Sequence, residues 1–223
     1  MFNRISPASV LLAIILLASA VATSAPALRA APAAAPSAEE AAYTETINAR
    51  ADKIVATLAI ADAPKALRIR DQIAGQYRNL RTIHEERDQL KKSAPSSAAA
   101  NNDLIMAKLS QLHRAYVSRL SVELSPEQVD AIKDGMTYGV APLTFRVYQE
   151  MLPDLTAEQK IQIHAWLIEA REYAMDAGSS GEKHGWFGKY KGRINNYLSA
   201  AGINMKDAEK AAAARRQSTA KKH

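Results

Sequence analysis

Trp186-Phe-Gly-Lys-Tyr-Lys-Gly-Arg-Ile-Asn-Asn-Tyr197 is the stretch of this sequence that decides the fold. At the helical period of 3.6 residues it separates into two stripes. The apolar stripe consists of Phe187, Ile194 and Leu198, and we expect it to face the core. The stretch is therefore predicted to lie in one amphipathic helix from about Glu182 to Gly202, which ends at a residue that suits a helix C-terminus.

The second stripe of this helix carries aromatic and polar residues at positions 186, 190, 193 and 197. A site for a sugar ring needs flat aromatic faces flanked by planar hydrogen-bonding groups, and this stripe supplies both. Aromatic residues at helical spacing are also often buried between helices, so the sequence leaves a ligand surface and a core face open. The candidate ligand-binding residues are Tyr138, Trp166, His184, Trp186, Tyr190, Arg193, Asn196 and Tyr197.

Three glycines, Gly185, Gly188 and Gly192, lie on one face of the same helix. Each costs an exposed helix about 1 kcal/mol relative to alanine, so three together need a reason. Close approach of a neighbouring helix and close approach of a ligand are the two interpretations, and tight helix packing is the commoner one.

Outside this helix the sequence is also helical. The phrases Leu124-Ser-Pro-Glu-Gln128 and Leu155-Thr-Ala-Glu-Gln159 are capping boxes, in which a hydroxyl and a glutamine side chain satisfy backbone amides at a helix start. Hydrophobic periodicity predicts further helices over Glu39–Ala59, Asp62–Lys91, Asp103–Glu123, Leu143–Met151 and Ala157–Gly178, with a loop over Ser93–Asn102. No segment alternates like a strand. We predict a single all-α, helical-bundle-like domain of about six or seven helices over residues 39–203.

The two ends of the chain lie outside that predicted domain. Residues 1–30 read as a signal peptide, with Arg4 before an apolar run from Val10 to Val21 that is shorter than the about 20 residues a membrane span needs. Cleavage after Ser24 or after Ala27 is left open. Residues 31–38 form an Ala/Pro-rich flexible spacer. We expect an exported protein of the periplasm or cell surface, with no transmembrane segment after cleavage.

The net charge of +6 belongs to these ends rather than to the domain. The signal peptide and a basic tail over residues 204–223 account for the whole excess, so residues 39–203 balance to zero. Nucleic-acid binding requires a basic surface on the folded domain. We therefore expect no specific nucleic-acid partner, and a tail that frays or touches acidic surfaces weakly.

The sequence contains no signature of catalysis. It has no cysteine, which excludes thiolate metal sites and a cysteine nucleophile. The histidines His84, His113, His164 and His184 lack metal-binding spacing, although His184 stands out beside Trp186. The carboxylates of Glu169, Glu172 and Asp176 share a helical face, as a glycan hydrolase would need, but so do those of many solvated helices. We predict no cofactor, no metal and no catalytic residues.

Several phrases resemble a known family. They are Asp134-Gly-Met-Thr-Tyr-Gly-Val, Tyr148-Gln-Glu-Met-Leu-Pro-Asp-Leu-Thr-Ala-Glu-Gln159, Glu169-Ala-Arg-Glu-Tyr-Ala-Met-Asp-Ala-Gly-Ser-Ser180 and the stretch from Trp186 to Tyr197. From about Tyr43 to Gly202 the chain is similar to an uncharacterised family of exported bacterial proteins, a domain of unknown function that carries a sugar-binding label. The resemblance implies export and a carbohydrate ligand, and it supplies no catalytic residues.

A second, weaker resemblance comes from the twin Leu-Ser/Thr-x-x-Gln phrases, which are similar to a motif of the Spy/CpxP periplasmic chaperones. Any capping box after a leucine produces the same phrase. We expect an exported, non-enzymatic binding protein for oligo- or polysaccharide, with the aromatic stripe as its site. The alternatives are a Spy/CpxP-like chaperone and a glycan-active hydrolase. The oligomeric state is left open.

Overall fold

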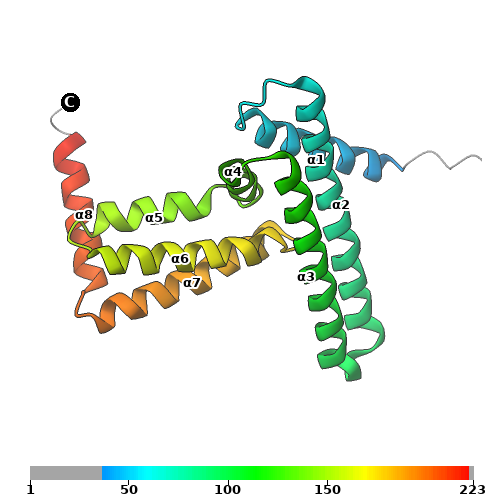
Figure 1. Cartoon of the computed structure of the whole chain (residues 1–223). Coiled ribbons are helices and arrows are strands. Elements are labelled where there is room, and N and C mark those ends of the chain that lie inside the picture. The colour runs from blue at the N-terminus through cyan, green and yellow to red at the C-terminus, as the bar shows by residue number, and fades with distance from the viewer. Residues whose placement is uncertain (1–36, 221–223) are drawn as a thin grey trace, which may run out of the picture. The chain divides into compact units, whose positions relative to one another are not determined.

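The computed structural model describes residues 37–220 of the chain. These residues form eight α-helices and one short 3-10 helix, with no strand among them (Figure 1). The elements are α1 (Ala38–Ala56), α2 (Ala63–Ser93), η1 (Pro95–Ser97), α3 (Ala98–Glu123), α4 (Pro126–Met136), α5 (Val140–Met151), α6 (Ala157–Met175), α7 (Ser180–Ala200) and α8 (Met205–Ala220). The all-α prediction is confirmed for the described part: seven helices, α1 to α7, lie within the predicted domain, and α8 is an eighth helix beyond it. The predicted signal peptide and most of the spacer lie outside the described residues.

Side-chain caps start the helices where the sequence predicts them. Ser125 accepts from the amide of Gln128 at 3.3 Å, and the Gln128 side chain accepts from the amide of Ser125 at 3.2 Å. Thr156 and Gln159 repeat the arrangement at the start of α6. Both capping boxes are therefore confirmed. Each cap contributes on the order of 1 kcal/mol and fixes where the helix begins.

Two segments are more helical than predicted. The expected loop over Ser93–Asn102 narrows to η1, because the alanines that follow favour the helix and α3 starts at Ala98. Residues 205–220, in the tail that was expected to fray, form α8, which packs against α5 and α7. Ala212 is buried there, and Arg215 donates to the backbone carbonyls of Glu150 and Met151, which satisfies the last turn of α5.

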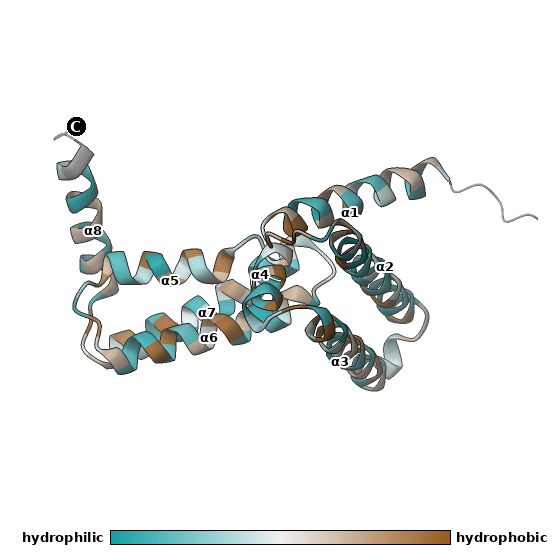
Figure 2. Cartoon of the chain, turned by 45° about the horizontal axis from the view of Figure 1, so that its top comes forward, coloured by the Kyte–Doolittle hydropathy of each residue, from teal (hydrophilic) through white to brown (hydrophobic). Residues whose placement is uncertain are grey.

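The helices build two hydrophobic clusters. The first lies among α1 to α4 and is centred on residues such as Ile69, Tyr116 and Ile132, each completely buried. The second lies among α5 to α7 and includes Leu167 and Phe187. α2 and α3 run side by side, as do α6 and α7 (Figure 1). Hydrophobic and hydrophilic residues mix along every helix, as expected of amphipathic helices that bury one side (Figure 2).

The two clusters meet where α6 reaches the first four helices. Met175, at the end of α6, is completely buried in the first cluster. One turn earlier, the guanidinium of Arg171 is buried and pairs with Asp130 at 2.6 Å and Asp134 at 3.0 Å on α4. This junction sets how α6 and α7 face α2 and α3.

Candidate functional site

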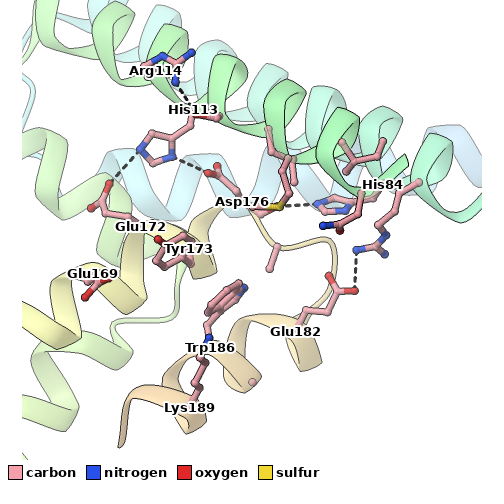
Figure 3. Close-up of a pocket in the computed structure, with 18 of the residues that line it drawn as sticks. His84, His113, Arg114, Glu169, Glu172, Tyr173, Asp176, Glu182, Trp186 and Lys189 are labelled. Atoms are coloured by element: carbon pink, nitrogen blue, oxygen red, sulfur yellow. Dashed lines mark hydrogen bonds and ion pairs between the residues drawn. The ribbon is translucent and has the colours of Figure 1, made fainter. Parts of the chain in front are cut away.

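A cleft of about 790 Å³ lies beside that junction, with α2 and α3 on one side and α6 and α7 on the other. Side chains from all four helices line it, and Figure 3 shows them converging. Sites for small ligands typically have volumes of roughly 300–1,000 Å³. The cleft is therefore the candidate functional site.

The floor of the cleft is a set of paired charges on α3 and α6, which we define as His113, Glu172 and Asp176. The Nδ1 atom of His113 lies 2.7 Å from Asp176 Oδ2, and its Nε2 atom lies 3.2 Å from Glu172 Oε2 (Figure 3). A carboxylate accepts, so both ring nitrogens donate and the imidazole is a cation. The hydrogen bond to Asp176, followed by that to Glu172, raises the pKa of His113 from 6.5 to about 9.

The Glu172 carboxylate is ionised because it accepts hydrogen bonds from the neighbouring cations. Burial raises its pKa, but hydrogen bonds from His113 and Lys133 outweigh burial and lower the pKa from 4.5 to about 2. The Lys133 ammonium on α4 lies 2.8 Å from Glu172 Oε2. The floor thus ties α3, α4 and α6 together through paired charges, although the second carboxylate oxygen of Asp176, Oδ1, is buried without a hydrogen-bond partner.

His84 lines the cleft on α2, and Gly178 lies directly against its ring. The Nε2 atom of His84 donates to the backbone carbonyl of Asp176 at 2.7 Å, since a carbonyl can only accept. A Cβ atom at Gly178 would lie 2.7 Å from Cγ of His84. The chain therefore needs a glycine at this position to let the imidazole reach its partner.

The wall of the cleft is aromatic and consists of Tyr173, Trp186 and Lys189. The rings of Tyr173 and Trp186 stack with centroids 4.6 Å apart and planes 18° apart. The Lys189 ammonium lies 5.1 Å from the centre of the Trp186 ring, and in Figure 3 that ring lies between Tyr173 and Lys189. Trp186 is half-buried, while Tyr173 is 42% exposed. The wall therefore presents aromatic surface to the cleft.

The structure distributes the eight predicted site residues over several places. Of the eight, Trp186 lines the cleft, and Tyr190 lies buried behind Tyr173 at a ring distance of 6.4 Å. The other predicted residues lie outside the cleft. The ring of Trp166 contacts the ring of Tyr197 edge-on at a centroid distance of 5.3 Å, and the Arg193 guanidinium lies 4.6 Å from the Trp166 ring. Tyr138 stacks on His184 at a centroid distance of 5.7 Å, and Asn196 is exposed.

The burial of α7 answers the question that its two stripes left open. Phe187, Ile194 and Leu198 are at most 1% exposed, so the prediction of an apolar core stripe is confirmed. The aromatic stripe is mixed: Tyr190 is buried, Trp186 and Tyr197 are half-buried and Arg193 is exposed. On α6, Tyr173 follows Leu167 and Ala170 on the inward stripe, but it is 42% exposed because the cleft lies beside it.

The three glycines of α7 do not serve helix packing. A Cβ atom at Gly185, Gly188 or Gly192 would meet nothing within 4 Å, and all three positions are exposed. The interpretation of tight packing is therefore wrong for the described residues. Gly185 lines the cleft next to Trp186, which leaves the approach of a ligand as the remaining interpretation at that position.

Sequence reasoning missed the histidines of α2 and α3. A signal was available, because Leu109, His113, Tyr116 and Leu120 follow one another at helical spacing, which places His113 on the buried stripe of α3. His84 likewise follows Leu80 by four residues, and both are buried. A titratable residue on an apolar stripe requires a partner, but the stripe cannot name it.

No group of three or more histidine, aspartate or glutamate side chains in residues 37–220 is placed to hold a metal ion. Within the same residues, no helix is both long enough and apolar enough to cross a membrane.

Comparison with known proteins identifies the family. Residues 44–218 match the family described as Protein of unknown function (DUF3826). No curated protein matches the chain. The match covers most of the chain, from within α1 to within α8, so the chain belongs to this family of unknown function.

Proposed function

We propose that this member of the family is an exported, non-enzymatic protein that binds a saccharide in the cleft between α2, α3, α6 and α7. The observation that carries the proposal is the wall. Trp186 and Tyr173 offer stacked aromatic surface within a cleft whose floor is made of charged and hydrogen-bonding groups. Sugar rings combine an apolar face with a rim of hydroxyls, and such a cleft matches both.

The proposed site is on the helix that the sequence indicated, but on a different part of it. Of the predicted residues, Trp186 is retained as the central contact, and Tyr190 supports Tyr173 from behind. The group around Trp166 and Arg193 lies outside the cleft, so we do not assign it to this site. The unfilled side of Gly185 gives a ligand room beside Trp186.

A glycan-active hydrolase is the second candidate, and one observation favours it: Glu169, Glu172 and Asp176 all line the cleft. A glycosidase needs one carboxyl group that stays protonated until it meets the leaving group. Here each carboxylate has a cationic partner, since His113 serves Asp176 and Glu172, and Arg193 lies 3.6 Å from Glu169. The pairing supports binding over hydrolysis.

The chaperone alternative calls for an exposed apolar concave surface and a dimer. Apolar residues such as Met106 and Leu109 do line part of the cleft, but charged groups occupy its floor. That mixture suits a polar ligand better than an unfolded chain. Export rests on the predicted signal peptide, and cell fractionation tests it: the protein recovered in the cytoplasm with residues 1–30 intact would contradict export.

Tryptophan fluorescence tests the binding proposal directly, because the chain has two tryptophans and only Trp186 lines the cleft. Trp166→Phe leaves Trp186 as the single reporter, and Trp186→Phe leaves Trp166. Titration with a panel of neutral and acidic oligosaccharides should give a saturable change in the Trp166→Phe protein and none in the Trp186→Phe protein. Equal fluorescence changes in both proteins would show that the binding site is not specific to Trp186. No change in either protein would contradict saccharide binding.

A further inference from the structure

The charges of the cleft are unequally matched, and this inequality bears on the class of saccharide that the proposed site takes. On the acidic side, His113 pairs with Glu172 and Asp176, and Arg87 lies 3.0 Å from Glu182. Glu169 faces Arg193. Each cleft carboxylate thus already has a cation within 4.0 Å.

Two cations of the cleft have no such partner. Arg114 on α3 donates to the hydroxyl of Ser110 at 2.6 Å, and this is a neutral acceptor. Lys189 on α7 places its ammonium over the Trp186 ring. Neither cation has a carboxylate within 4.0 Å among the described residues, whereas Arg87 pairs with Glu182 and Lys91 lies 4.0 Å from Asp88.

Lys189 is placed where the ligand must go. Tyr173 stacks on Trp186, and Figure 3 shows Lys189 on the other side of the indole. A sugar ring that stacks on the remaining face of Trp186 must displace the ammonium from it. The displaced ammonium loses its cation–π contact and part of its water, so it needs a new acceptor close by.

We propose that the ligand is an acidic saccharide, whose ring stacks on Trp186 and whose anionic group pairs with Lys189, while Arg114, across the cleft on α3, holds a second anionic group. This inference rests on the proposed function and names its ligand class. A hydrogen bond between ionised partners is about twice as strong as one between neutral groups, so a carboxylate or a sulfate compensates the displaced ammonium where a hydroxyl would not.

Matched ligand pairs test the inference. The probes are trisaccharides of galacturonate, glucuronate and mannuronate, each compared with its methyl ester, which keeps the sugar skeleton and removes the charge, and a sulfated galactose trisaccharide compared with its neutral parent. Binding is measured by calorimetry on the mature protein at low and high salt. We expect at least one acid to bind about tenfold or more tighter than its neutral partner, and the preference to shrink as salt screens it. The carboxylate and sulfate arms show which anionic group is taken.

Variants locate the effect. Lys189→Gln and Arg114→Gln should each weaken binding of the acid by about tenfold, whereas Lys189→Gln should not weaken binding of the neutral partner, because no ammonium is then left to displace from Trp186. Lys191→Gln is the matched control, since Lys191 is also exposed on α7 but does not line the cleft. Circular dichroism checks that all three variants fold.

The outcomes separate the two proposals. Equal affinities for acid and neutral partner in the unaltered protein would overturn the acidic-saccharide inference while leaving saccharide binding in place. A preference for acid that survives both Lys189→Gln and Arg114→Gln would also overturn it. Failure of every saccharide to bind would contradict the proposed function itself, and the inference with it.

Discussion

The floor and the wall of the cleft lie side by side, yet they differ in burial and in whether their charges are paired. In the floor, His113, Glu172 and Asp176 are largely buried and every charge has an opposite charge beside it. In the wall, Trp186 and Tyr173 remain partly exposed and Lys189 has no carboxylate partner in the described residues. Charges that are already paired within the protein have less to offer a charged group of a ligand than charges without an opposite partner. We therefore infer that the floor stabilises the fold and that the wall binds.

The largest expected effect tests the wall. Trp186→Ala should weaken binding of the saccharide that the fluorescence panel identifies by about 2–3 kcal/mol, or roughly 30- to 150-fold, because it removes the stacking surface. Calorimetry measures the loss.

Trp166→Ala is the matched control, since Trp166 is also half-buried and in contact with an aromatic ring and an arginine, but outside the cleft. It should leave the affinity unchanged. A comparable loss in both variants would mean that the two aromatic groups act together and that the contrast between wall and surroundings is wrong.

The floor should respond in stability. His113→Phe removes the cation between Glu172 and Asp176 and leaves two carboxylates facing an apolar ring, which should lower the free energy of unfolding by about 2–3 kcal/mol. Urea denaturation measures this. His164→Phe is the control, because His164 is exposed and pairs only edge-on with Phe145, so its loss should be within about 0.5 kcal/mol.

The same histidine predicts a dependence of stability on pH. The pKa of His113 is about 9 in the folded protein and 6.5 as the reference for the unfolded chain, so folding favours the protonated ring. The resulting stability is fully present below pH 6.5 and is lost as the pH rises through 9. A pKa change from 6.5 to 9 corresponds to about 3.4 kcal/mol, and screening by solvent at this partly exposed pair reduces the contribution to about 2–3 kcal/mol.

The contribution of Lys183 to stability changes with pH in the opposite direction, so it must be separated from that of His113. Burial lowers its pKa from 10.5 to about 8, so its contribution improves as the pH rises from 8 towards 10.5. Unfolding curves of the unaltered protein and of His113→Gln at each pH give a difference in which the Lys183 contribution cancels. That difference should fall between pH 6.5 and 9, and a constant difference would show that His113 does not carry the charge of the floor.

The features of this molecule that the sequence could predict are those formed within a single helix. The core stripe of α7 was predictable because Phe187, Ile194 and Leu198 lie on one helix, and periodicity is a local property. The capping boxes at Ser125 and Thr156 are local as well. Such features determine each helix and its buried side, and together they indicate the fold class.

The floor was not predictable because it is not local. His113 and Asp176 are 63 residues apart, and their meeting depends on how α6 reaches α3. Tyr173 shows the same limit in reverse: its position on the inward stripe of α6 is correct, but at that point the opposite surface is a cleft and the residue stays exposed. Periodicity identifies the side of a helix that faces inward, and it does not show whether another helix or an open cleft lies opposite.

The smallest expected effects come from adding a single methyl group at each of two glycines, one near the floor and one beside the wall. Gly178→Ala, two residues after Asp176 of the floor, would place a Cβ atom 2.7 Å from the His84 ring, and the ring must shift from its hydrogen bond to the Asp176 carbonyl. We expect a loss of about 1–2 kcal/mol in the free energy of unfolding.

Gly185→Ala, beside Trp186, meets nothing within 4 Å and lies inside α7. It should raise the free energy of unfolding by about 0.5–1 kcal/mol, since alanine favours the helix. If a saccharide approaches Trp186 over this position, the added methyl group should weaken binding while stability rises. Gly188→Ala is the control, because it lies in the same helix with the same open surroundings but does not line the cleft. A stabilised Gly185→Ala protein that binds as tightly as Gly188→Ala would show that the ligand does not cross this part of the wall.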